Sequence, residues 1–390
     1  MAGCHVQCSD DVGSRVQGLP NEQRFFEGSD GNTPPWEQRG LIDSAVRSAM
    51  RRWAVPGVSV SVVDDGRLVW AGSYGWKKSG SDDPVRLDTP FQSSSLSKPV
   101  AAAVALTLVA DGSLDLDLPV SSYLDSWPLL GPVDDGVTLR RLLSHTSGLG
   151  VDAFAGYPSD GTPPELREIL LGEGGANHGP IKVKTNPGLG YLHSGGGYVL
   201  LQYLVSKVSG SSFEREARGR LLNPVGMKNS SFGGVPEDAS AGHRADGVPV
   251  EGGPRVHPEL AAAGLWTTAV DLARFVLFLQ SQKGSYEGHR IIPRDLIEEM
   301  MSPVIELPDS PGRYMGLGFV LQPCGEEGAW FRYAGANVGF RALMVGEAHG
   351  GRAAVILTNG DNGERLATEV LEVIATAFAW PPCEDEHSGQ

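Results

Sequence analysis

Residues 91 to 99 read Phe91-Gln92-Ser93-Ser94-Ser95-Leu96-Ser97-Lys98-Pro99 and contain one Ser-x-x-Lys tetrapeptide. Proline fits a helix only in its first turn, so Pro99 predicts a helix that begins here and runs to about Ala110. Three residues make nearly one helical turn, so the Ser95 hydroxyl and the Lys98 amine are expected on one face. Ser95 then lies at the positive end of the helix, where an oxyanion is stabilised, and a buried Lys98 can act as a base.

Ser-x-x-Lys alone is a weak signal, because a helix-capping serine followed by a surface lysine has the same spacing. The scarcity of lysine makes this signal more specific. Lys98 is the only lysine with a serine three positions before it; the others stand at positions 77, 78, 182, 184, 207, 228 and 283. The chain therefore offers a single serine–lysine pair at this spacing.

The charge balance excludes some partners. Lysine and arginine total 32 against 47 aspartates and glutamates, so the 390-residue chain carries a formal charge of −15. Such a charge repels phosphate, and we expect neither nucleic acid nor a membrane as partner. We find no apolar run of about 18 residues and no secretory leader, which favours a cytoplasmic protein. The four cysteines lack metal-ligand spacing, so we expect free thiols and no metal or other cofactor, and a disulfide between the chain ends stays open as the alternative.

Strand-like sequences lie near both chain ends, and helical patterns fill the middle. We therefore expect an α+β fold: an antiparallel sheet formed by both ends and flanked by helices, with an inserted, mostly helical domain. The expected elements are a helix over 41–53, strands over 58–63 and 67–74, helices after 98, 137 and 268 and over 197–209, strands over 340–345 and 353–358, and a helix over 365–378. The expected divisions are a flexible arm (1–36), a sheet domain (37–95 and 330–382), the inserted domain (96–329) and a tail (383–390).

Further segments occur in the order of a known family. The longest, 137–149, reads VTLRRLLSHTSGL, and His145 within it is expected to be structural. From about residue 40 to 380 the chain resembles the serine β-lactamase and penicillin-binding-protein-like hydrolases, especially the class C β-lactamase and esterase branch. The resemblance implies a β-lactamase/transpeptidase-like fold, with Ser95 as the nucleophile of an acyl-enzyme and Lys98 as its general base. The other matching segments are 110–117, 187–188, 197–198, 223–227, 263–268 and 357–360.

The family's second catalytic element, usually Tyr-x-Asn, is altered here. Spacings counted from Pro187 and from Tyr198 both place its tyrosine at His193, and Gly195 replaces its asparagine. An imidazole with an ordinary pKa of about 6.5 can shuttle a proton at neutral pH, so His193 is the implied acid and base. Two alternatives stay open: Tyr191 as the shuttle, and His193 as a plain loop residue in a protein that has lost activity.

The third element, Lys-Thr-Gly in β-lactamases, is replaced by Tyr-Ala-Gly at 333–335. By the resemblance this strand borders the pocket, and the amides of Ser95 and Ala336 form the oxyanion hole. Loss of the lysine removes a cation that would bind an anionic substrate, which favours a neutral substrate face or one that uses an arginine. The implied pocket residues are Tyr191, Tyr333, Gly335, Asn337 and Arg341.

These features predict a serine acyl-transfer enzyme that acts on a small-molecule ester or amide, with hydrolysis favoured. One alternative is a transacylase of natural-product biosynthesis, which moves the acyl group to an amine or alcohol acceptor. Another is a catalytically inactive binding protein on the same fold. The expected partners are a small acyl donor and either water or that acceptor.

Overall fold

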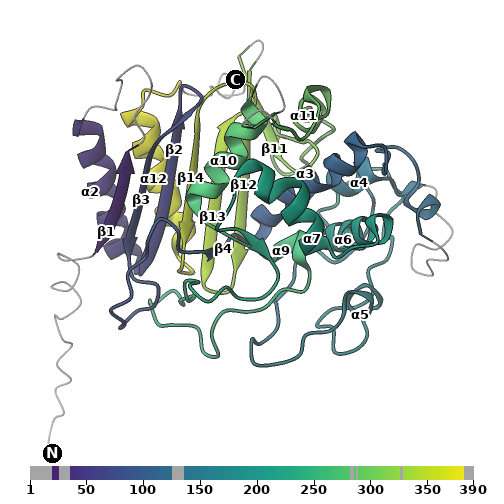
Figure 1. The fold of residues 1–390 in the computed structure, drawn as a ribbon, viewed down its shortest axis with the longest axis horizontal. Helices are drawn as coiled ribbons and strands as arrows, with labels where there is room; N and C mark the ends of the chain where they lie inside the picture. The colour runs from purple at the N-terminus through teal and green to yellow at the C-terminus, as the bar shows by residue number, and fades with distance from the viewer. Residues whose placement is uncertain are drawn as a thin grey trace, which may run out of the picture.

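A nine-stranded antiparallel sheet forms the centre of the molecule (Figure 1). The computed structural model describes residues 20–25, 36–124, 136–281, 285–286, 289–325 and 328–381. The order of strands in the sheet is β1-β3-β2-β14-β13-β12-β11-β10-β9. These strands are β1 (Asn21–Phe25), β2 (Gly57–Asp64), β3 (Arg67–Gly75), β9 (Ile305–Glu306), β10 (Tyr314–Met315), β11 (Val320–Cys324), β12 (Gly328–Asn337), β13 (Phe340–Glu347) and β14 (Ala353–Thr358).

Short strands and the helices lie outside the nine-stranded sheet. The short strands are β4 (Phe91–Gln92), β5 (Ser231–Phe232), β6 (Leu265–Thr267), β7 (Ser285–Tyr286) and β8 (His289–Arg290). The helices are α2 (Trp36–Trp53), α3 (Ser97–Ala110), α4 (Leu139–Leu143), α5 (Leu166–Leu171), α6 (Gly195–Ser209), α7 (Phe213–Ala217), α8 (Asn223–Val225), α9 (Leu260–Ala263), α10 (Ala269–Gln280), α11 (Arg294–Met300) and α12 (Gly363–Ala377), with 3-10 turns η1 (Ser94–Leu96) and η2 (Val120–Ser122) and the π-helical turn η4 (Arg218–Leu222).

Both ends of the chain supply the sheet, as the sequence predicts. The hairpin β2–β3 comes from the N-terminal part and the hairpin β13–β14 from the C-terminal part. The two hairpins join where β14 pairs with β2, for example at Ile356 and Val60. The predicted α+β fold, with an antiparallel sheet built from both ends and flanked by helices, is confirmed.

Helices cover both faces of the sheet. On one face α2 and α12 lie side by side although they are far apart in sequence (Figure 1). Their apolar stripes, which include Val46 and Val370, pack on sheet residues such as Val60 and Ile356 in one buried cluster. On the other face α10 packs against β2, β3 and β14. Helices therefore bury both faces of the sheet.

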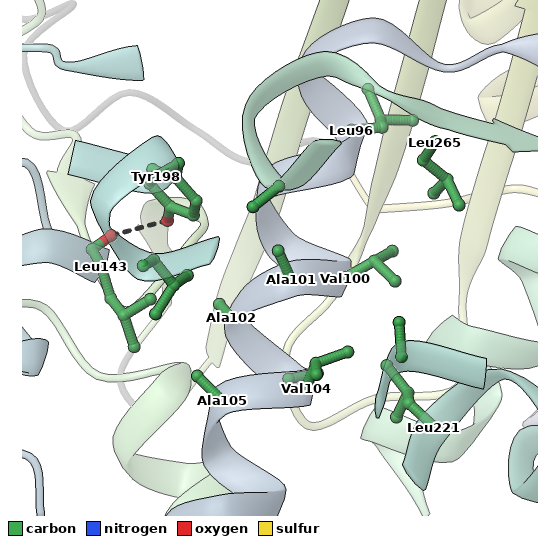
Figure 2. Packing of buried hydrophobic residues seen from close by; sticks show 14 of the residues in the cluster. Leu96, Val100, Ala101, Ala102, Val104, Ala105, Leu143, Tyr198, Leu221 and Leu265 are labelled. Atoms are coloured by element: carbon green, nitrogen blue, oxygen red, sulfur yellow. Dashed lines mark hydrogen bonds between the residues drawn. The ribbon is translucent and has the colours of Figure 1, made fainter. Parts of the chain in front are cut away.

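The helix α3 lies at the centre of the second and larger core (Figure 2). Every residue from Ser97 to Leu108 is buried, because the helix is built from alanine, valine and leucine on all sides. Small alanine side chains allow α6 and α9 to approach closely, and the Tyr198 hydroxyl of α6 donates to the Leu143 carbonyl at 3.0 Å. The start of α3 is thus held from several directions.

Two expected boundaries differ from the structure. Within the arm expected over 1–36, residues 21–25 form the edge strand β1, which pairs with β3 from Asn21–Tyr74 to Phe25–Trp70. The segment lacks an alternating pattern of its own, and its order comes from the β3 edge that it covers. Strands β9, β10 and β11 also join the sheet before residue 330, the start expected for its C-terminal part. The predicted tail, 383–390, lies outside the described residues.

Within the described ranges, no helix is both long enough and apolar enough to cross a membrane.

Candidate active site

Ser95 and Lys98 lie where η1 runs into α3. Lys98 Nζ donates to Ser95 Oγ at 3.0 Å, and Lys98 is only 2% exposed. This separation is within the range for a nucleophile and its general base. The structure thus brings the two residues together on one face at the start of the helix, the arrangement that their spacing predicts.

Burial of Lys98 favours its neutral form, although its contacts suit the charged form. Its Nζ lies 3.1 Å from the Ala262 carbonyl oxygen and 5.8 Å from the centre of the Tyr198 ring. Burial lowers the pKa of Lys98 to about 8, and the negative charge of Asp152 opposes this shift. Roughly one molecule in ten then carries a neutral amine at pH 7, which is the form that can accept a proton.

The serines around Ser95 fix the backbone of the turn. Ser93 Oγ donates to the Leu265 carbonyl at 3.0 Å, and the Leu265 amide donates to Ser97 Oγ at 2.9 Å. Ser97 Oγ in turn donates to the Ser94 carbonyl at 2.5 Å. Ser94 itself has a φ of 54°, in the left-handed region that a serine rarely adopts. Strain of this kind persists only where neighbouring contacts hold it, here immediately before Ser95.

Strand β12 presents an open edge to Ser95. Its pairing with β11 ends at Arg332, whereas its pairing with β13 continues to Asn337. Gly335 lies directly against the serine turn: a Cβ at this position would come within 2.4 Å of the Ser93 carbonyl oxygen and 3.0 Å of the Ser95 nitrogen. Only glycine lets the strand pass this close to the serine turn.

The register of β12 also determines where the Ala336 amide points. A two-residue turn joins β12 to β13, so Asn337 and Phe340 form the hydrogen-bonded pair that closes the hairpin. Hydrogen bonding alternates along an antiparallel pair, so the amide of Ala336 turns to the open edge. That edge faces Ser95, and this direction suits the predicted role of Ala336 in an oxyanion hole.

His193 precedes α6, and Ser194 caps that helix by accepting from the Gly197 amide at 2.8 Å. The His193 side chain is 37% exposed, and its Nδ1 contacts a carboxylate oxygen of Asp152. Burial and the positive charge of Lys98 lower the pKa of His193 below its usual value of 6.5, while Asp152 acts in the opposite direction. The imidazole is therefore neutral at pH 7 and able to accept a proton.

His145 is structural in its contacts, as expected. It is 1% exposed, and its Nδ1 accepts from the Ser194 amide at 3.1 Å, while its carbonyl accepts from the Leu192 amide. Its ring lies 4.4 Å from the His193 ring, centre to centre. Burial holds the pKa of His145 well below its usual value. A neutral His145 therefore supports the segment that carries His193.

Tyr191, the alternative proton shuttle, packs edge-on against His145 with ring centres 5.9 Å apart. Burial and the charge of Asp152 raise the pKa of Tyr191 to about 12. Its phenol therefore stays protonated at neutral pH and is a poor base. At neutral pH the His193 imidazole is thus able to accept a proton, whereas the Tyr191 phenol is not.

The remaining predicted pocket residues differ in position. Tyr333 and Asn337 are nearly buried, and the Asn337 amide donates to the Gln92 side-chain oxygen at 2.9 Å. The Arg341 guanidinium bonds the Asn337 carbonyl at 2.7 Å and the Asp361 carboxylate at 3.1 Å. Arg341 thus braces the β12–β13 turn. The charge of Arg341 is paired with Asp361, which argues against its predicted role as the cation that binds a substrate.

A family model described as Beta-lactamase matches residues 42–377, which is most of the chain. The chain belongs to the beta-lactamase family. This is a family of serine hydrolases. In this chain the contact between Lys98 and Ser95 fits the chemistry of a serine hydrolase. The predicted β-lactamase/transpeptidase-like fold is also confirmed by this match.

Among its relatives in the beta-lactamase family, penicillin-binding protein 4* of Bacillus subtilis (strain 168) is 23% identical over 336 residues, which are 80% of this chain and 70% of that protein. Esterase EstB of Burkholderia gladioli is 29% identical over 218 residues, or 53% of this chain and 55% of that protein. A solved structure of D-amino acid amidase from Ochrobactrum anthropi SV3 with L-phenylalanine aligns with a TM-score of 0.71 at 22% identity, over 87% of this chain and 99% of that one. This last likeness shows the fold.

Two parts of this beta-lactamase-family site could not be read from the sequence. The Ala262 carbonyl contacts Lys98 through its backbone, and no side-chain pattern signals that. Asp152 lies 41 positions before His193, as a single acidic residue in a loop without periodicity. The only hint was its position shortly after the family string that ends at Leu149.

Two buried ionisable groups of this beta-lactamase-family protein precede the helix α9, whose Ala262 carbonyl binds Lys98. His257 is 3% exposed and Glu259 0%, and His257 Nδ1 lies 3.9 Å from a Glu259 oxygen. Burial raises the pKa of Glu259 to about 7 and lowers that of His257 to about 4. In the folded protein Glu259 therefore resists ionisation up to neutral pH.

Replacing Glu259 with glutamine is expected to stabilise the protein at pH 8 by about 3 kcal/mol and to have little effect at pH 4. The folded pKa lies above the usual 4.5, so the unfolded chain loses its proton first and stability falls as pH rises from about 4.5 to about 7. Urea unfolding at both pH values measures this. The exposed Glu237→Gln is the control, with an expected change within about 0.5 kcal/mol. A pH-independent effect of Glu259→Gln would contradict the assignment.

Proposed function

We propose that this protein is a serine hydrolase of small-molecule esters or amides that works through an acyl-enzyme on Ser95. The observation that carries the proposal is the Lys98–Ser95 contact of 3.0 Å, made by a lysine that is 2% exposed and whose pKa burial lowers to about 8. A buried amine that is partly neutral near pH 7 is suited to activating a serine hydroxyl.

Acylation begins when Ser95 Oγ bonds to the carbonyl carbon of the substrate and its proton passes to Lys98 Nζ. The amides of Ser95 and Ala336 stabilise the oxyanion of the tetrahedral intermediate. The C–O or C–N bond to the leaving group then breaks. His193 relays the proton taken up by Lys98 to the leaving oxygen or nitrogen, which departs neutral.

The second nucleophile decides between hydrolysis and acyl transfer. The His193 side chain is 37% exposed and Asp152 beside it is 77% exposed, so water reaches the proposed proton shuttle. This supports hydrolysis. Transfer to an amine or alcohol acceptor, as in a natural-product transacylase, uses the same acyl-enzyme, and a binding protein without activity would form none.

The substrate side of the pocket supports a neutral ligand. Tyr333 stands where β-lactamases have a lysine, and burial raises the pKa of its phenol further above the neutral range. The guanidinium of Arg341 is paired with Asp361. Neither Tyr333 nor Arg341 thus offers a free positive charge to a carboxylate, so we propose that the acyl donor is a small neutral ester or amide.

Stopped-flow kinetics with p-nitrophenyl acetate test this function. We expect a burst of p-nitrophenol equal to the enzyme concentration, followed by turnover in buffer alone. Acyl-enzyme that decays only when small amines or alcohols are added would identify a transacylase. Release no faster than in a Ser95→Ala control would indicate the inactive binding protein and contradict the proposal.

A further inference from the structure

The contact between Asp152 and His193 has a definite chemical meaning. An ionised carboxylate can only accept a hydrogen bond, so the His193 nitrogen that faces it, Nδ1, carries the proton. In a neutral imidazole the other nitrogen, Nε2, then holds a free lone pair. The contact therefore selects the tautomer in which Nε2 is the base.

Backbone contacts hold the two segments together. The Gly195 amide donates to the Asp152 carbonyl at 3.0 Å, and the Gly196 amide donates to the Val151 carbonyl at 2.9 Å. Ser194 Oγ donates to the Gly150 carbonyl at 3.1 Å. Three hydrogen bonds thus align residues 150–152 with residues 194–196, immediately beside the carboxylate–imidazole contact.

Two local features show that the close approach is built in. A Cβ on Gly195 would lie 2.7 Å from the Asp152 carbonyl oxygen and 2.7 Å from the Phe154 ring, so only glycine permits it. Val151, just before Asp152, has a φ of 65°, which is a strained conformation for a β-branched residue. The chain tolerates this strain where it seats Asp152 against His193.

We propose that Asp152 is a positioning residue for His193, which keeps the proton on Nδ1 and aims Nε2 at the Ser95 acyl group. This inference rests on the proposed function of His193 as the proton shuttle. Histidine at 193, glycine at 195 and aspartate at 152 then form one arrangement, in which a carboxylate-oriented imidazole replaces the tyrosine of the resembling enzymes.

The proton balance of deacylation follows from this tautomer. Water bonds through its oxygen to the acyl carbon, and its proton passes to His193 Nε2, which makes the ring an imidazolium beside the Asp152 carboxylate. The bond between the acyl carbon and Ser95 Oγ then breaks. His193 returns the proton to Ser95 Oγ, and the product leaves as a carboxylic acid with the enzyme restored.

The charges around His193 give the inference a distinct pH signature. Lys98 from α3 opposes protonation of His193, and Asp152 favours it. His145 packs on the His193 ring as a neutral group, and Tyr191, which packs on His145, is a protonated phenol. Asp152 also favours the charged form of Lys98. Removing the Asp152 charge therefore lowers both pKa values, so both acid limbs, that of acylation set by neutral Lys98 and that of deacylation set by neutral His193, move to lower pH.

Steady-state and single-turnover kinetics of Asp152→Asn test this. We expect a 10- to 100-fold lower deacylation rate with a KM lowered in proportion, because deacylation limits turnover, both acid limbs shifted to lower pH, and partial rescue in Asp152→Glu. Asp160→Asn is the matched control, since it makes the same charge change at an exposed position nearby, and it should leave rate and profile unchanged. A rate within threefold of wild type and unshifted limbs in Asp152→Asn would overturn the inference.

A double variant locates the effect. In a His193→Ala background, Asp152→Asn should lower the rate by less than twofold, because the residue through which Asp152 acts is already gone. A full additional loss in the double variant would assign Asp152 a role apart from His193 and contradict the proposal.

Nitrogen-15 NMR of labelled histidines separates this inference from the function itself, because it needs no turnover. The signals of His193, assigned by their loss in His193→Gln, should show the Nδ1–H tautomer in the wild type and a lower pKa in Asp152→Asn. An Nε2–H tautomer or an unchanged pKa would overturn the role of Asp152 even in an active enzyme. An inactive protein with the expected NMR behaviour would contradict only the proposed function.

Discussion

Replacing Lys98 with methionine is expected to lower the rate of Ser95 acylation by about 10³-fold, because the substitution removes the only amine in contact with Ser95 Oγ within the described structure. In the wild type the rate should rise with pH and level off above about 8, since only neutral Lys98 accepts the proton and its pKa is about 8. The variant should lose this inflection. Single-turnover kinetics with p-nitrophenyl acetate across pH 5 to 10 measure both effects.

The melting temperature shows whether the Lys98→Met variant still folds. Methionine removes a buried amine whose charge is disfavoured, so the melting temperature should rise rather than fall. Lys207→Met makes the same exchange at an exposed position near the far end of α6 and should leave the rate unchanged. A Lys98→Met enzyme within tenfold of the wild-type rate, or one that keeps the inflection near pH 8, would refute the assignment of the base.

Replacing His193 with alanine is expected to slow turnover by about 10²-fold, because proton transfer to the leaving group and from water loses its carrier. The pKa of His193 is lowered below 6.5, so the imidazole is protonated only in acid, and the wild-type rate should fall on the acid side below that value. The His193→Ala enzyme should lack this acid limb. Steady-state kinetics of both enzymes from pH 4 to 8 provide the comparison.

Tyr191→Phe is the matched variant for His193→Ala. It removes only a phenol oxygen next to the same segment, and that phenol, with a pKa of about 12, takes no proton at neutral pH. We expect its rate to stay within threefold of wild type. The reverse pattern, with a small effect of His193→Ala and a large one of Tyr191→Phe, would return the shuttle to Tyr191.

Local signals in the sequence predicted much of the fold. Pro99 marks the first turn of α3, and Thr268 caps α10 by accepting from the Asp271 amide at 3.1 Å. The alternating runs on either side of the turn at 64–66 form the hairpin β2–β3. These elements could be predicted because a proline, a cap or a two-residue period acts within a few positions.

The remaining features depend on contacts between distant segments. Strand β1 is ordered by the edge of β3, and Arg341 is drawn to Asp361 across the end of the sheet. Asp152 reaches His193 only after the loop that follows α4 is bonded to the start of α6. No local pattern carries such information. The contact between Ser95 and Lys98 could be predicted from the sequence, whereas the contact between Asp152 and His193 required the fold.

The intact mass of the protein after incubation with a fluorophosphonate tests most directly whether Ser95 is a nucleophile. We expect one adduct per chain, mapped by peptide sequencing to Ser95, and no adduct in Ser95→Ala, because the buried Lys98 amine contacts the Ser95 hydroxyl. Absence of an adduct on the wild-type protein, or equal labelling of Ser95→Ala, would contradict this role of Ser95.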